Sequence, residues 1–188
     1  MWWEERRKEL SKIIDGTPFK KYKRKILREY ERICNKGVPK RYTLAAATLE
    51  VLVSEGEAVS LEDVVSALGI SRGGVTKVIK RLYGRVPSSS VDNYVERALH
   101  LLGLPSSFKE GIMRVYREHE SLLKRYKPTV RAATCICLYL EEMGMLGRKA
   151  ITKKKVVRSL NVGYSTIRTV LNLIEKSRRK VVEPLLLT

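Results

Sequence analysis

The chain has 188 residues, of which 44% are hydrophobic, so it can bury one large core or two cores of about 90–100 residues each, and wholesale disorder is excluded. Its 38 Lys and Arg residues outnumber its 20 Asp and Glu residues, which leaves a formal net charge of +18 and favours a nucleic-acid partner over a merely solvated basic surface. No run of about 18 apolar residues occurs, so the sequence predicts no membrane span.

Proline and glycine residues divide the chain into helical segments, and no segment has the period-two alternation of a strand. The sequence therefore predicts an all-α fold with a C-terminal tail at 181–188. In chain order, we expect helices near 2–14, 18–35, 40–55, 60–68, 72–83, 90–102, 105–126, 128–143, 152–160 and 164–178.

The first five segments align with the last five, which predicts two tandem five-helix units, 1–86 and 87–180. The run Ala45-Ala46-Ala47-Thr48-Leu49 aligns with Ala133-Thr134-Cys135-Ile136-Cys137, for example. In each unit this third helix is apolar on nearly all sides and rich in small residues, so we expect it to be the central helix.

The last two helices of each unit have the pattern of a helix-turn-helix, in which two short helices pack across a tight turn. Gly69 stands at the first turn and Asn161 at the second, and both residue types tolerate a left-handed backbone. Ser71 can cap the helix that follows the first turn. The apolar places are filled by Val64, Val65, Leu68, Ile70, Val75 and Val78 in the first unit and by Val156, Val157, Leu160, Val162, Ile167 and Val170 in the second. Helix pairs that only close their own bundles remain the alternative.

The candidate DNA-binding side chains are those that the packing of these helix pairs does not require. Arg168 can reach two acceptors of a guanine at once, or it can clamp a phosphate. The neighbouring lysines and arginines can hold phosphates without reading sequence. The second unit supplies Lys153, Lys154, Lys155, Arg158, Tyr164, Ser165, Thr166, Arg168 and Thr169, and the first supplies Arg72, Lys77 and Lys80.

The sequence predicts no metal site, no cofactor and no enzymatic activity. Its three cysteines, Cys34, Cys135 and Cys137, form no C-x-x-C pair, which argues against a disulfide framework and against structural zinc. Cys135 and Cys137 are expected to be small buried hydrophobes. No glycine-rich phosphate loop, activated nucleophile or carboxylate pair stands out.

Segment 152–168 resembles the end of the second cyclin repeat of transcription factor IIB and of its archaeal counterpart, transcription factor B. Val162, Thr166, Ile167 and Arg168 match the family's Val-x-x-x-Thr-Ile-Arg pattern. Segments 92–104 and 127–144 are similar to the opening and the central helix of that repeat, and 42–82 is similar to the first repeat. The resemblance spans nearly the whole chain.

The resemblance implies two cyclin-like repeats that bind promoter DNA together with the TATA-binding protein, with Ser165 and Arg168 at the base-contacting places. We also expect a monomer, in a reducing compartment: the cytoplasm or nucleoid of an archaeal or viral host cell, or a nucleus. The family's zinc ribbon, which binds RNA polymerase, has no counterpart here, so recruitment of polymerase is not expected. Thr169-Val170-Leu171 replaces the family's Asn-Arg-Tyr, so the family's base preference is not carried over.

Two interpretations of the missing ribbon stay open, a core fragment and a divergent stand-alone protein. A second function follows from the stand-alone interpretation. Cyclin boxes also bind proteins through grooves between helices, so the chain is alternatively a regulator or decoy that acts mainly by protein–protein binding.

Overall fold

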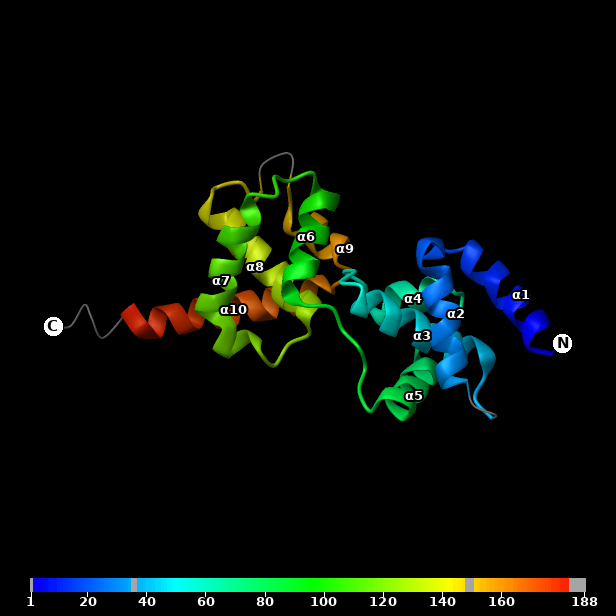
Figure 1. The fold of residues 1–188 in the computed structure, drawn as a ribbon. Coiled ribbons are helices and arrows are strands. Elements are labelled where there is room, and N and C mark those ends of the chain that lie inside the picture. The colour runs from blue at the N-terminus through cyan, green and yellow to red at the C-terminus, as the bar shows by residue number, and fades with distance from the viewer. Residues whose placement is uncertain (1, 35–36, 148–150, 183–188) are drawn as a thin grey trace. The chain divides into compact units, whose positions relative to one another are not determined.

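The computed structural model describes residues 2–34, 37–147 and 151–182, and within these ranges it contains helices and no strand. The all-α prediction is therefore confirmed. The chain divides into two compact units, Met1–Ser89 and Ser90–Thr188, each with five α-helices in its described part (Figure 1).

The first unit is built around one central helix. Its helices are α1 (Trp2–Asp15), α2 (Lys23–Ile33), α3 (Lys40–Ser54), α4 (Leu61–Ala67) and α5 (Arg72–Tyr83), and a 3-10 turn, η1 (Lys20–Tyr22), precedes α2. Helix α3 packs against α2, α4 and α5, whereas α1 packs chiefly against α2. Every residue from Thr43 to Leu49 is at most 2% exposed, as expected of a helix that is surrounded by others.

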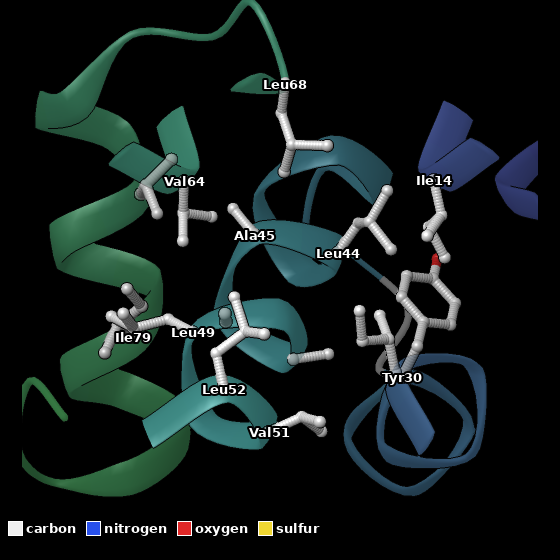
Figure 2. Close-up of a cluster of buried hydrophobic side chains, with 14 of the residues drawn as sticks. Ile14, Tyr30, Leu44, Ala45, Leu49, Val51, Leu52, Val64, Leu68 and Ile79 are labelled. Atoms are coloured by element: carbon white, nitrogen blue, oxygen red, sulfur yellow. The ribbon is translucent and has the colours of Figure 1, made fainter. Parts of the chain in front are cut away.

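The core of the first unit joins all five of its helices. Figure 2 shows Leu44, Leu49 and Leu52 of α3 among Ile14, Tyr30, Val64 and Ile79, which come from α1, α2, α4 and α5. Each such side chain contributes about 1.5–3 kcal/mol by leaving water. The positions of the last two helices in this unit are thus set by the same side chains that hold α3.

The second unit also has five α-helices in its described part. It contains α6 (Val91–Leu102), α7 (Phe108–Leu123), α8 (Pro128–Glu142), α9 (Lys153–Ser159) and α10 (Tyr164–Val182). Helix α8 contacts each of the other four, and the run from Ala132 to Leu138 is buried. The first helices differ, because α6 packs on α7, α8 and α9 while α1 lies mainly on α2.

Four helix ends lie three or more residues from the predicted ones, among them the start of α7, which is at Phe108 and not near 105. Helix α2 begins at Lys23 and not near 18, because the Thr17 hydroxyl bonds to the Ile14 carbonyl at 2.7 Å and accepts from the Phe19 amide at 3.2 Å. Helix α7 ends at Leu123 and not near 126, and beyond its end the carbonyls of Lys124 and Tyr126 accept hydrogen bonds from the Arg131 side chain. Helix α10 extends past 178 to Val182.

Candidate nucleic-acid interface

In the second unit a capped short helix leads through a tight turn into a long helix, α9 and α10 (Figure 1). The Thr152 hydroxyl accepts from the Lys155 amide at 3.2 Å and so caps α9. Asn161 lies in the turn with φ +52°, the only positive φ of a non-glycine residue in the described part of the chain. Gly69, at the corresponding place of the first unit, has φ +61°. The predicted left-handed turn residues are therefore confirmed.

Helix α10 has one buried stripe and exposes the rest of its first turns. Ile167, Val170 and Ile174 are each 1% exposed and face the core. Their spacing follows the helical period, so the side chains between them must face outward. The exposed side chains are the predicted Tyr164, Ser165, Thr166, Arg168 and Thr169.

The hydrogen-bonding capacity of these exposed residues is mostly uncommitted. The Thr169 hydroxyl donates to the Ser165 carbonyl at 3.1 Å, so its oxygen still has acceptor capacity. Arg168 forms no ion pair with any described residue. The start of α10 thus offers hydroxyls and a guanidinium to an external partner.

Helix α9 adds a cluster of positive charge beside this surface. Lys154, Lys155 and Arg158 are exposed. Lys153 is different, because it is half-buried and its ammonium lies 3.5 Å from a Glu141 carboxylate oxygen on α8. Lys153 is therefore engaged within the unit, while the other three cations of the predicted cluster face solvent.

A groove of about 450 Å³ lies between α8 and α10, and the sequence patterns did not predict it. Leu138 and Leu171 supply apolar lining, and Arg168 contributes to one wall. Three carboxylates lie around it, those of Glu141, Glu142 and Glu175. In the sequence, the adjacent pair Glu141-Glu142 was the one indication of acidic side chains at this place in so basic a chain. Two of the carboxylates are paired, Glu141 with Lys153 at 3.5 Å and Glu142 with Arg178 at 3.1 Å, so the lining around the predicted base-reading Arg168 holds both signs of charge.

The first unit presents a similar helix pair with fewer hydrogen-bonding side chains. Gly69 and Asn161 are equivalent turn residues, so Gly73 and Thr76 occupy the places of Ser165 and Arg168. Lys77 and Lys80 are exposed, whereas Arg72 forms an ion pair with Glu62 at 2.5 Å. This helix offers cations for phosphate but no arginine at the place of Arg168.

One predicted contact of the first unit is wrong. Ser71 occupies the N-cap position of α5, but its side chain makes no capping hydrogen bond. The capped helix of this pair is α4, where Ser60 and Asp63 form a reciprocal capping box. The Ser-x-x-Asp spacing at 60–63 was the sequence signal for it.

The described residues contain no cluster of potential metal ligands. Cys135 and Cys137 are fully buried, as expected, and burial raises the pKa of each thiol to about 12. These thiols therefore stay protonated and are poor nucleophiles. His119 lies 3.2 Å from Arg178, and burial, followed by the charge of Arg178, lowers its pKa.

Comparison with protein-family models gives no match, and a search of curated proteins gives none either. In the described part of the chain, no helix combines the length and the apolar character that crossing a membrane requires.

Proposed function

We propose that this chain binds double-stranded DNA through α9 and α10, as a transcription factor IIB-like core that acts at promoters together with the TATA-binding protein. In this proposal, α10 enters the major groove with its first turns, and the cations of α9 hold the flanking phosphates. Helix α5 of the first unit contacts DNA mainly through the phosphate backbone.

One observation carries the proposal. The start of α10 exposes hydroxyls and a guanidinium that forms no ion pair with any described residue, directly after a helix with three exposed cations. Burial of Ile167 and Val170 fixes the rotation of α10, and the five predicted polar side chains at its start are exposed. This is the distribution that a recognition helix needs, because base edges are read by hydrogen bonds and phosphates by cations.

The test is a selection of binding sites from random duplexes, run with and without purified TATA-binding protein. The proposal expects enrichment of a defined element, placed beside a TATA sequence when that protein is present. Recovery of duplexes with no shared element under both conditions would contradict sequence-preferring binding.

A second candidate, protein–protein binding, is favoured by the groove between α8 and α10. Its apolar lining suits an apolar segment of a partner, and its three carboxylates share the lining with Lys153, Arg168 and Arg178. This function expects Leu171→Arg to abolish binding of purified TATA-binding protein without changing binding to DNA. A DNA-binding defect of equal size in that variant would count against an independent docking groove.

A further inference from the structure

The first unit has a basic groove away from its helix-turn-helix. The groove has a volume of about 750 Å³ and lies between α1 and α2. Helix α1 contributes Arg7, Lys8 and Lys12, and α2 contributes Lys23 and Arg24. Glu4 is the one acidic residue of its lining. The lining therefore carries an excess of positive charge, on helices that the proposed function does not use.

Most of these cations are free to bind a partner. Lys23 is engaged with Asp15, with a Nζ–Oδ1 distance of 2.8 Å. The other four, Arg7, Lys8, Lys12 and Arg24, are exposed and form no ion pair with any described residue. Four like charges along one groove repel each other, and a polyanion would relieve that repulsion.

The floor of the groove distinguishes between two kinds of polyanion. An acidic protein segment usually anchors itself through apolar side chains in a pocket. Here the one apolar residue in the lining, Leu27, is only 5% exposed, so the apolar surface of the groove comes mainly from the aliphatic stems of its Lys and Arg side chains and forms no pocket for an apolar anchor. A nucleic-acid backbone needs no such anchor, because Lys and Arg contacts to phosphate supply its affinity.

We propose that the groove between α1 and α2 is a second DNA-binding surface, which holds the phosphate backbone of a duplex without reading its sequence. This inference rests on the proposed function in taking duplex DNA as the polyanion. It adds phosphate binding on helices other than α4 and α5. The affinity of the full chain then depends on α1 and α2 as well as on the helix-turn-helix pairs.

The test compares three variants of the full chain with the wild type, by fluorescence anisotropy on a labelled duplex at several salt concentrations. The groove variant carries Arg7→Ala, Lys8→Ala, Lys12→Ala and Arg24→Ala. The control variant removes the same charges from exposed positions elsewhere, with Arg41→Ala, Arg117→Ala, Lys124→Ala and Lys127→Ala. The third variant, Ser165→Ala with Arg168→Ala, tests the recognition helix.

Circular dichroism verifies that each variant is folded. If the groove variant is unfolded, Lys8→Gln with Lys12→Gln replaces it.

The slope of log affinity against log salt concentration should become shallower by about 0.9 for each phosphate that the variant no longer neutralises, hence by about 2–4 in the groove variant. The control should keep nearly the wild-type slope. An unchanged groove variant, or an equal change of slope in the control, would overturn this inference and leave the proposed function standing. A shallower slope in the groove variant, with no change of sequence preference in the Ser165 and Arg168 variant, would sustain the inference and refute the recognition helix. Absence of duplex binding by the wild type would refute both. Tighter binding of poly-glutamate than of the duplex, lost in the groove variant, would overturn the inference alone.

Discussion

At the scale of single residues, Arg168 distinguishes sequence reading from phosphate holding. It projects from the start of α10 without an ion pair among the described residues, whereas Lys154 projects from α9. We expect Arg168→Ala to lose about 1–3 kcal/mol of binding free energy on a selected site. The variant should also show a smaller difference in affinity between selected and random duplexes. We expect Lys154→Ala to weaken binding to selected and random duplexes equally. Titrations of both duplexes measure the two effects, and a uniform weakening in Arg168→Ala would make this residue a phosphate ligand.

Two neighbouring glycines of α5 provide a matched test of packing. A Cβ added at Gly74 would overlap the ring of Tyr42 on α3, whereas a Cβ at Gly73 meets nothing within 4 Å. Gly74→Ala should therefore lower the free energy of unfolding by about 1–3 kcal/mol, because the ring must move. Gly73→Ala should raise it by about 0.5–1 kcal/mol, because alanine favours a helix. Urea unfolding measures both, and equal effects would mean that α3 and α5 do not pack closely.

At the scale of elements, the two serines that precede α4 and α5 should differ. Ser60 accepts from the Asp63 amide at 3.2 Å, whereas Ser71 makes no capping bond with its side chain. Ser60→Ala should lower the free energy of unfolding by about 1 kcal/mol, because the amides at the start of α4 lose their partner. Ser71→Ala should change it by less than about 0.5 kcal/mol. A larger decrease from Ser71→Ala, in the same urea titrations, would show that Ser71 caps α5 in solution.

A half-buried carboxylate, that of Glu29, joins α2 to α5 and makes that junction sensitive to acid. Glu29 accepts from Arg32 Nε at 2.8 Å and from the Tyr83 hydroxyl at 2.7 Å. The hydrogen bond from Arg32, and then the one from Tyr83, lower the pKa of Glu29 below its usual 4.5, against an opposing effect of burial. Because the folded pKa is lowered, the stabilisation is present above pH 4.5 and disappears as pH falls further.

We therefore expect Glu29→Gln to flatten the dependence of stability on pH below 4.5, with most of its cost at neutral pH. Thermal unfolding of the variant and the wild type across about pH 3–7 checks this. Glu31, which is exposed on the same helix, provides the control as Glu31→Gln. If the loss of stability at low pH is the same in Glu29→Gln as in the wild type, it comes from other carboxylates. Glu57 is one such group, because Lys21 and Tyr22 lower its pKa.

At the scale of the whole molecule, the net charge of +18 makes binding to DNA strongly dependent on salt. With about six to ten phosphates bound, affinity should fall by about 10³–10⁵ between about 50 and 200 mM salt, because the release of counterions is less favourable at high salt. Filter binding on one duplex at several salt concentrations measures this. Affinity independent of salt would exclude a phosphate-dominated interface and favour protein–protein binding.

The sequence by itself determined the helices, the central place of α3 and α8, and the exposed face of α10. These follow from the spacing of apolar residues, which is local and periodic. For the same reason Asn161 and Gly69 were identifiable as turn residues, because few residue types adopt a positive φ.

Only the tertiary structure decided which cations are free. Lys153 and Arg72 look equivalent to Lys154 and Lys77 in the sequence, yet Glu141 and Glu62 neutralise the first two. Both grooves likewise form only where two helices lie side by side, α8 with α10 in one and α1 with α2 in the other. Ion pairing and grooves depend on distances across the fold, and the spacing of residues along the chain does not specify those distances.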